Sequence, residues 1–304
     1  MGRRPPRTDL DGVLILDKPA GPTSHDIVQR VRRATGQGRV GHTGTLDPAA
    51  TGVLVVCLGR ATKLVRFLQA GSKTYAARMV LGVATDSQDA DGEVVGTTDA
   101  SGVDERALCE ALTRFQGEIL QVPPMVSALK VGGERLHEKA RRGEEVARDP
   151  RPVTVHELVL DGFTPGERAE ASFLVTCSAG TYVRTLAHDV GELLGVGGSL
   201  LSLRRLANGP FTSDEAVTLD QLEAASDVRT LLVPPEEAAR RSLPARPVSD
   251  PDLAYRLTQG GRTQGHDIDG PYALTYGTRL LGVYRDVDGR AVPELVWTRP
   301  EELA

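Results

Sequence analysis

The stretch RVGHTGTLDPAATGVLVVCLG, residues 39–59, joins a polar loop to the longest apolar run in the chain. Its first half is rich in glycine and threonine and contains His42 and Asp47. Its second half contains residues 53–58, an uninterrupted apolar run with three valines, which predicts a buried strand. A polar loop on a rigid strand is a common position for binding and catalytic residues, so this stretch is the first candidate for a functional site.

Asp47 precedes Pro48, which pushes the backbone of the aspartate toward an extended geometry. A carboxylate held on a rigid loop can act as a nucleophile or a general base. An aspartate before a proline is also a common turn residue, whose side chain accepts a hydrogen bond from the nearby backbone. From the loop alone, the turn role is the more common of the two.

The composition is that of a folded globular protein. The 304 residues, 40% hydrophobic and 25% charged, fit about two domains. The longest apolar run has only six residues, so no membrane-spanning helix is expected. The N-terminus lacks a secretory pattern, and the three cysteines lack metal-ligand spacing, so we expect a cytoplasmic protein. The six histidines show no zinc-binding pattern.

The net charge of -5 conceals an uneven distribution. Residues 1–73 contain 12 Lys and Arg against 5 Asp and Glu, whereas residues 74–304 contain 24 against 36. A basic face, rather than a basic total, is what a polyanion requires, so nucleic acid is a candidate partner. A solvated surface rich in arginine is the competing interpretation.

The hydrophobic pattern predicts strands at residues 13–16, 53–58, 75–83 and 171–177, and helices at residues 24–34, 104–115 and 186–194. Residues 123–152, bounded by prolines, predict a binding insertion with a helix at 133–142. Five prolines between residues 234 and 251 predict a domain boundary that few contacts cross. The residues after it predict a small β domain, with strands at 272–276, 280–285 and 294–298.

Two motif matches fail on their context. Residues 36–41 spell G-x-G-x-x-G, but a predicted helix precedes them where the dinucleotide fingerprint needs a strand. Residues 86–92 contain three aspartates, but the calcium-loop pattern would need acids at Ser87 and Thr98. We therefore interpret residues 86–92 as an acidic turn.

Four segments in sequence order resemble the motifs of the bacterial tRNA pseudouridine synthase B family, whose members act on the T-loop uridine at position 55 of tRNA. They are DKPAGPTS at 17–24, GHTGTLDPAATGVL at 41–54, KTY at 73–75 and CSAGTYVRTL at 177–186. LRRL follows at 203–206, and PPMVSALK at 123–130 and RPVTV at 151–155 resemble the borders of an RNA-clamping insertion. The resemblance covers about residues 12–233.

The resemblance implies an α+β fold with two domains. A pseudouridine-synthase catalytic domain over residues 1–236 has a mixed, largely antiparallel sheet flanked by helices and loops, with the RNA-clamping insertion at about 123–152. Residues 237–246 form a linker, and residues 247–304 form a small, PUA-like RNA-binding β domain. That resemblance is weaker, because residues 250–304 carry 6 Lys and Arg against 9 Asp and Glu, and an electrostatic grip on phosphates requires a basic surface.

The resemblance also implies the reaction and its partners. The T-loop uridine is flipped into a pocket and isomerised to pseudouridine, with an aspartate as nucleophile or base. No cofactor and no metal is implied, because nothing is oxidised and no group is donated. The T arm of tRNA is the expected partner, without a membrane or an obligate protein partner, and a monomer is expected.

Three residues match the reaction centre of the family. Asp47 matches the catalytic aspartate, Arg184 the arginine that pairs with it, and Tyr75 the aromatic residue that stacks on the flipped base. A buried core tyrosine and a surface ion pair worth under about 1 kcal/mol are the structural alternatives for Tyr75 and Arg184.

Other residues match the surroundings of that centre. Tyr182 and Leu203 match the walls of the base pocket, and His42 matches a residue that contacts the RNA. Lys18, in the first motif, is expected to support the site. Val126 departs from the tyrosine found in many relatives, so an aromatic contact there is not expected.

Two other functions remain as alternatives. The first is a non-catalytic protein that binds or folds tRNA on the same scaffold, and the presence of Asp47 favours the enzyme instead. The second is a hydrolase with Cys177 as nucleophile and His188 as base, but no glycine-rich oxyanion turn surrounds Cys177.

Overall fold

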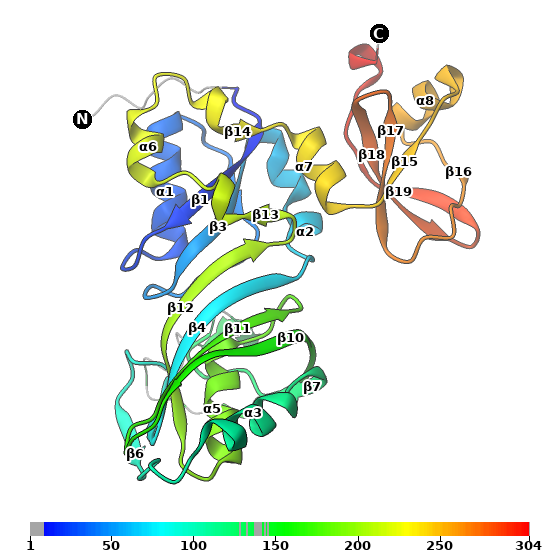
Figure 1. Cartoon of the computed structure of the whole chain (residues 1–304). Helices are drawn as coiled ribbons and strands as arrows, with labels where there is room; N and C mark the ends of the chain where they lie inside the picture. The colour runs from blue at the N-terminus through cyan, green and yellow to red at the C-terminus, as the bar shows by residue number, and fades with distance from the viewer. Residues whose placement is uncertain are drawn as a thin grey trace.

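The computed structural model describes residues 9–127, 129–131, 133–136, 142, 144 and 146–303. Among them, a ten-stranded sheet has the order β14-β1-β3-β12-β4-β11-β10-β7, with β2 paired to β3 and β13 to β12 (Figure 1). Its strands are β1 (Gly12–Lys18), β2 (Val40–His42), β3 (Thr51–Leu58), β4 (Lys73–Leu81), β7 (Gly117–Gln121), β10 (Arg151–Thr164), β11 (Glu170–Cys177), β12 (Gly198–Asn208), β13 (Phe211–Thr212) and β14 (Leu232–Val233). All neighbours pair antiparallel except β3 and β12, so the expected mixed, largely antiparallel sheet is confirmed.

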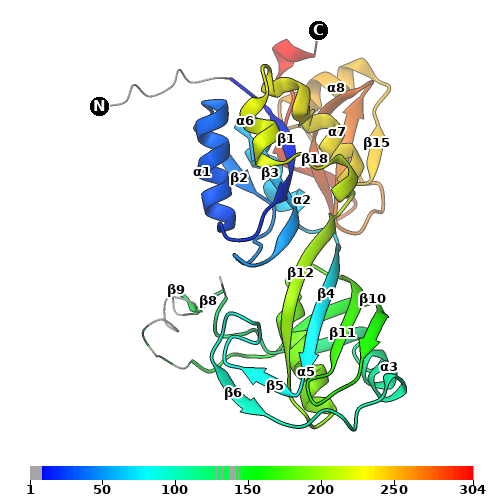
Figure 2. The same cartoon turned by 60° about the vertical axis from the view of Figure 1, so that its left-hand side comes forward.

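The sheet has two halves with separate cores. In one half, α3 (Glu105–Thr113) and α5 (Val183–Leu193) pack on β4, β10, β11 and β12. In the other half, α1 (Ser24–Thr35) and α6 (Leu219–Ala224) pack on one face of β1 and β3. The opposite face of β1 and β3 packs on the 3-10 helix η1 (Gly59–Leu64), α2 (Val65–Leu68) and α7 (Pro235–Ser242). Figure 2 shows β12 and β4 running from one half to the other.

Helix α1 shows how closely local sequence sets an element. Thr23 and Asp26 form the capping box at its N-terminus, and Gly36, with φ +67°, ends it in the left-handed conformation. Ile27, Val28 and Val31 are its buried face. The helix predicted over residues 24–34 is confirmed.

The two halves of the sheet meet along a very short seam. β3 and β12 pair through only two residue pairs, Thr51 with Arg204 and Gly52 with Arg205. Gly52 has φ +99°, and a Cβ atom built on it would lie 2.2 Å from the Arg205 carbonyl oxygen. Only glycine combines this backbone conformation with this close approach.

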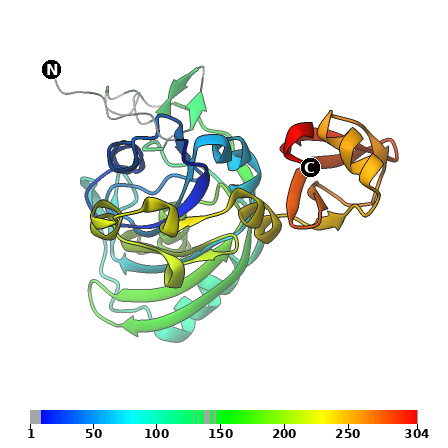
Figure 3. The ribbon, with the colours of Figure 1, turned by 90° about the horizontal axis from the view of Figure 1, so that it is seen from above.

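Residues 245–296 form a second, five-stranded sheet with the order β15-β17-β18-β19-β16, which Figure 3 shows to one side of the larger sheet. Together with two helices, this sheet makes up the C-terminal unit, residues 245–303. Its elements are β15 (Ala245–Pro247), α8 (Pro251–Thr258), β16 (Thr263–Gln264), β17 (Pro271–Tyr276), β18 (Arg279–Val287), β19 (Arg290–Val296) and η4 (Pro300–Glu302). The buried Tyr272 and Tyr284 belong to its own core. The expected small β domain is therefore present.

The stretch expected to be a linker is more ordered than its prolines suggest. α7 spans Pro235–Ser242, because Pro235 occupies its first turn, where the missing N–H costs nothing. Much of the expected linker, residues 237–246, is therefore helix, while the domain limits remain a proposal.

The insertion differs from the prediction at its start. Residues 134–135, within the helix predicted at 133–142, form strand β9, which pairs with β8 (Lys130–Val131). Residues 137–141 and 143 lie outside the described residues.

Two further strands, β5 (Val83–Thr85) and β6 (Val94–Thr97), pair as a hairpin around the acidic turn of residues 86–92.

No helix in the described part of the chain has the length and apolar character needed to cross a bilayer.

The C-terminal unit packs firmly against α7 and η1. Trp297 is 5% exposed, its indole N–H donates to Glu236 at 2.9 Å, and the Arg60 guanidinium lies 5.0 Å from the centre of its ring. Leu280 and Val283 of the C-terminal unit also join the core cluster that includes β1 and β3. The expectation that few contacts cross the boundary was therefore wrong.

The first prediction concerns this interface. Trp297→Ala should lower the free energy of unfolding by about 3 kcal/mol, because it removes a buried aromatic ring and leaves Glu236 without its donor. Chemical denaturation would measure the loss, and hydrogen exchange should become faster in residues 245–303. Tyr255→Ala is the control, since Tyr255 is 51% exposed and should cost under about 0.5 kcal/mol. Equal losses in the two variants would contradict a packed interface.

Candidate active site

A cleft of about 470 Å³ opens at the seam between the two halves of the sheet. It lies between the loop that carries Asp47, strands β4 and β12, and the N-terminal end of α5. Its size is in the usual range for a small-molecule pocket. Five of the candidate residues line it: Asp47, Tyr75, Tyr182, Arg184 and Leu203. Residues from three of the four motifs, together with Leu203 of the LRRL segment, therefore converge on one cavity.

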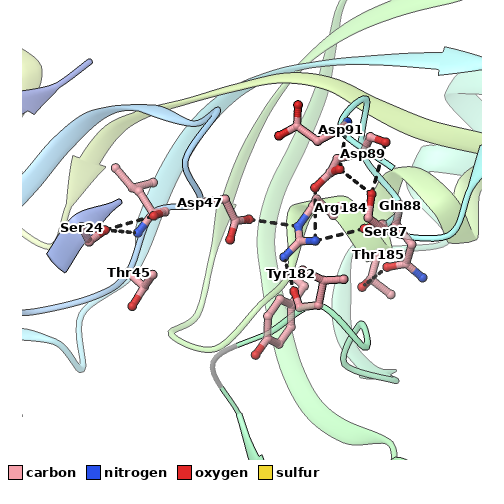
Figure 4. Close-up of polar contacts among 12 residues, drawn as sticks. Ser24, Thr45, Asp47, Ser87, Gln88, Asp89, Asp91, Tyr182, Arg184 and Thr185 are labelled. Atoms are coloured by element: carbon pink, nitrogen blue, oxygen red, sulfur yellow. Dashed lines mark hydrogen bonds and ion pairs between the residues drawn. The ribbon is translucent and has the colours of Figure 1, made fainter. Parts of the chain in front are cut away.

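Asp47 and Arg184 form an ion pair at the edge of this cleft, with Nε of Arg184 3.0 Å from Oδ2 of Asp47 (Figure 4). The Arg184 side chain is 4% exposed, whereas that of Asp47 is 43% exposed. Nη1 of Arg184 donates to the Ser87 carbonyl at 3.0 Å and lies 3.2 Å from Oδ2 of Asp89. Nη2 donates to the Val126 carbonyl at 2.8 Å. The guanidinium is therefore fixed on all sides, unlike that of a surface ion pair.

Desolvation by the neighbouring protein raises the pKa of Asp47 above the usual carboxyl value. The positive charge of Arg184 opposes the rise, the negative charge of Asp89 adds to it, and Lys18 opposes it. A carboxylate that is poorly solvated but still open to the cleft is more basic and more nucleophilic than one in water.

Lys18 holds the loop of Asp47 from beneath. Its side chain is fully buried, and its ammonium donates to the carbonyls of Pro48 at 2.9 Å and Ala50 at 2.7 Å, and to Pro19 at 3.0 Å. Burial lowers the pKa of Lys18 to about 8, and the charge of Asp47 opposes that shift. The supporting role expected for Lys18 thus has a clear geometry, since two of the three carbonyls lie within three residues after Asp47.

Ser24 holds the other side of the same loop. Its hydroxyl accepts a hydrogen bond from the Leu46 N–H at 2.9 Å and donates to the Leu46 carbonyl at 3.0 Å (Figure 4). The backbone on each side of Asp47 is therefore tied to β1 or to α1.

The aromatic candidates lie on two different elements. Tyr75 is a buried residue of β4, and burial raises the pKa of its hydroxyl. Tyr182 precedes α5, and its backbone N–H and carbonyl are both bound by the Gln121 side chain, at 2.7 and 3.0 Å. Leu203 lies on β12 and lines the same cleft. These three side chains contribute the aromatic and apolar part of the cleft lining.

His42, expected to contact the RNA, does not line the cleft. It lies on β2, where its Nδ1 accepts a hydrogen bond from the Gly44 N–H at 3.3 Å. Burial and the nearby Arg205 charge lower the pKa of His42, which favours the neutral ring. This hydrogen bond gives His42 a structural role within the loop, and contact with RNA stays a prediction.

Sequence reasoning missed two residues of the site. Asp89 was included only in an acidic turn, yet it is the second carboxylate on Arg184, and its Oδ1 accepts from Ser87 and from the Asp91 N–H. Acidic turns are too common for the sequence to single it out. Arg205 lines the cleft and is buried, whereas its neighbour Arg204 on β12 is more exposed. Successive side chains of a strand point to opposite faces, and this alternation is the only sequence signal that could have distinguished Arg205.

The other chemistries lose support. Cys177 is buried, and burial raises the pKa of its thiol to about 11, so the thiolate needed for a nucleophile is disfavoured. Within the described residues, no three His, Cys, Asp or Glu side chains are grouped so that they could hold a metal ion.

Comparison with known proteins identifies one family. Residues 32–183 match the model of the TruB family pseudouridylate synthase N-terminal domain, and residues 184–240 match that of the tRNA pseudouridylate synthase B C-terminal domain. The chain is 44% identical to tRNA pseudouridine synthase B of Thermobifida fusca over 94% of this chain and 98% of the relative. It is 54% identical to the enzyme of the same name from Symbiobacterium thermophilum, over 76% of each chain.

Solved structures agree with this result. The chain is 27% identical to a protein in a Cbf5-Nop10-Gar1 complex, with a TM-score of 0.74 over 96% of this chain and 86% of that one. It is 26% identical to a protein in the archaeal box H/ACA Nop10-Cbf5 complex, with a TM-score of 0.73 over 96% and 88% of the two chains.

The second prediction tests the support beneath Asp47. Lys18→Met should lower the free energy of unfolding by about 3 kcal/mol, because the apolar methionine side chain cannot donate to the three carbonyls that Lys18 binds, one of them in a fully buried hydrogen bond. Lys63→Met, at an exposed position of η1, is the matched control and should change stability by under about 0.5 kcal/mol. Chemical denaturation of both variants provides the measurement. A Lys18→Met variant as stable as the wild type would show that the three hydrogen bonds do not hold the loop.

Proposed function

Because the chain belongs to the TruB family of pseudouridylate synthases and is a tRNA-modifying isomerase, we propose that its substrate is the T-loop uridine at position 55 of tRNA. The carrying observation is the Asp47–Arg184 ion pair, 3.0 Å long, at the edge of a cleft walled by Tyr75, Tyr182 and Leu203. A reactive carboxylate beside an aromatic, largely apolar wall suits a nucleobase and its sugar.

The reaction needs few groups. Conversion of uridine to pseudouridine breaks the N-glycosidic bond, turns the base and joins its C5 carbon to the sugar. No electrons are exchanged with a second molecule and no group is donated, so the side chains of the cleft are sufficient. In this proposal Asp47 acts as nucleophile or general base, and Arg184 holds its carboxylate and balances its charge.

The target base must leave its stack to reach Asp47. Extrusion of a stacked base costs a few kcal/mol. Stacking on an aromatic side chain returns about 1–3 kcal/mol. Tyr75 lines the cleft beside Asp47 and is the ring proposed for that role, with Tyr182 and Leu203 enclosing the flipped base.

The RNA would approach across a basic rim. Arg66 lines the cleft with more than half of its side chain exposed, and residues 1–73 hold the excess of Lys and Arg. Phosphate contacts from such residues position RNA without reading its sequence. The remaining parts of the proposal are a clamp at about residues 123–152, an RNA-binding unit at 247–304 after the catalytic domain of residues 1–236, and a cytoplasmic monomer without a cofactor or an obligate protein partner.

The third prediction concerns the carboxylate. Asp47→Asn should reduce pseudouridine formation to below 1% of the wild-type rate, which corresponds to an increase of about 3 kcal/mol or more in the activation free energy. The amide keeps the shape of the side chain, so tRNA affinity should stay within about threefold. Unmodified tRNA transcripts, mapped for pseudouridine at single-nucleotide resolution, supply the assay.

Asp17→Asn is the control for this experiment, since Asp17 pairs with Arg204 away from the cleft. Its turnover should stay within about threefold of the wild type. Wild-type protein that modifies no T-loop uridine would refute the proposed substrate. An active Asp47→Asn variant would instead remove Asp47 from the reaction.

The fourth prediction separates the two uses of Tyr75. Tyr75→Phe keeps the ring and loses the hydroxyl, whereas Tyr75→Leu loses both. We expect both variants to lose turnover, with kcat down about 100-fold or more, because the hydroxyl also moves a proton. Only the Leu variant should also bind tRNA more weakly, by about 1–3 kcal/mol. Full activity of Tyr75→Phe would restrict Tyr75 to stacking, and full activity of Tyr75→Leu would exclude both roles.

A further inference from the structure

Tyr182 lies at the point where a turn of cleft residues enters helix α5. Residues 178–182 connect β11 to this helix, and every one of them lines the cleft. Tyr182 is the N-cap residue of α5, but its side chain makes no capping hydrogen bond. A tyrosine cannot supply the cap that serine, threonine, aspartate or asparagine would supply at this position. The backbone of Tyr182 therefore needs support from another element.

Gln121, on strand β7, supplies that support. Its Oε1 accepts a hydrogen bond from the Tyr182 N–H at 2.7 Å, and its Nε2 donates to the Tyr182 carbonyl at 3.0 Å. Gln121 is 2% exposed, so water does not compete strongly for these hydrogen bonds. A carboxamide has an acceptor and a donor side by side, and can therefore bind both polar groups of one residue. Gln121 thus fixes the backbone of Tyr182 on both sides of its Cα atom, and with it the direction of the side chain.

Gln121 is also the residue at which the insertion leaves the sheet. It is the last residue of β7, and it pairs with Arg151, the first residue of β10. This pair is the root of the insertion. The start of the turn is tied to β10 as well, because the Ser178 N–H donates to the Thr154 carbonyl at 2.8 Å and the Ser178 hydroxyl accepts from the Thr154 N–H at 2.9 Å. The two strands that carry the insertion therefore hold the turn at both ends.

Arg184, two positions after Tyr182, has a separate set of partners. Its guanidinium contacts the carboxylates of Asp47 and Asp89 and donates to the Ser87 carbonyl. None of these contacts involves Gln121. Loss of the Gln121 hydrogen bonds should therefore move the Tyr182 ring and leave the ion pair of Asp47 in place.

We propose that Gln121 is a positioning residue for isomerisation: it holds the Tyr182 ring against the flipped base and ties this wall of the pocket to the root of the insertion. This inference rests on the proposed function, because it takes Tyr182 as part of the enclosure around that base. Gln121 does not line the cleft, so it acts through Tyr182. The base must turn inside the pocket during the reaction, and a wall in a fixed position limits the orientations that it can take.

The test compares two buried glutamines. Gln121→Met keeps the length of the side chain and removes both hydrogen-bonding groups. We expect kcat and kcat/KM for tRNA to fall together by about tenfold or more, with KM within about threefold, because the fixed ring matters most while the base turns. Phosphate contacts elsewhere on the protein should keep the RNA bound.

Gln37→Met is the matched control. Gln37 is 8% exposed, its Nε2 donates to the Leu10 carbonyl at 3.0 Å, and its Oε1 accepts from the Arg39 N–H at 2.9 Å, outside the cleft. Both variants lose one hydrogen bond to a backbone N–H and one to a carbonyl, so chemical denaturation should show similar losses of stability. Only Gln121→Met should lose turnover, and the kcat of Gln37→Met should stay within about twofold of the wild type. A wild-type kcat for Gln121→Met would overturn the proposal.

A double-mutant cycle shows whether Gln121 acts through the Tyr182 ring. In the Tyr182→Ala background, Gln121→Met should lower kcat by less than about twofold, because the ring that Gln121 positions is already absent. A merely structural role of Gln121 predicts the same fold-loss of kcat in both backgrounds. That additive result would contradict the inference even if Gln121→Met is slow.

Gln121→Asn provides a second test if Gln121→Met fails to fold. It keeps the amide but is one methylene shorter, so from the same backbone position it cannot reach both the N–H and the carbonyl of Tyr182. Its kcat should fall by about fivefold or more with little change in KM. A fully active Gln121→Asn would refute this inference and leave the proposed function standing. Failure of the wild-type protein to modify T-loop uridine would refute the proposed function instead.

Discussion

The seam between β3 and β12 is the constraint on which the site depends. The two strands touch through only two residue pairs, and the second is possible because Gly52 has no side chain to meet the Arg205 carbonyl. So short a parallel contact leaves the two half-sheets to diverge beyond it, and the cleft occupies that space. The Asp47 loop comes from one half and Tyr75 from the other, so any shift along the seam would separate the two groups.

Two buried cations stabilise the loop without neutralising its carboxylate. Lys18 and Arg205 direct their N–H groups at backbone carbonyls, which satisfies their hydrogen bonding in a buried position. The direct ion pair of Asp47 is left to Arg184, which Asp89 also shares. A carboxylate that shares its cation with a second acid is held in place yet remains more basic than one in an exclusive salt bridge. This division suits a group that must react as well as stay oriented.

How far the sequence predicts this arrangement depends on the range of each interaction. Helix α1 and strand β3 follow from short-range patterns, a capping box and an apolar run, and both were predicted. The convergence of Asp47, Tyr75 and Arg184 rested on a family resemblance, because no periodicity relates Arg184 to residues more than 100 positions earlier in the chain. Asp89 and Arg205 were not singled out, since their importance comes from partners on other strands. The prolines near residue 240 predicted a linker where the structure has helix α7, because proline is common in the first turn of a helix as well as in linkers.

The C-terminal unit has a net negative charge, yet its packing against α2 and α7 allows it to affect the cleft without binding phosphates itself. Arg66 on α2 lines the cleft and donates to the Glu294 carbonyl of β19 at 2.7 Å. α2 also lies beside α7, and Trp297 and Arg60 fasten the C-terminal sheet to that surface. The orientation of a basic side chain at the rim is thus set by the backbone of the C-terminal unit, whose own charge is unfavourable for RNA. A direct phosphate grip requires basic residues on the unit itself, whereas this contact requires only that β19 stay packed against α2. The net charge of the unit is therefore a poor guide to its contribution.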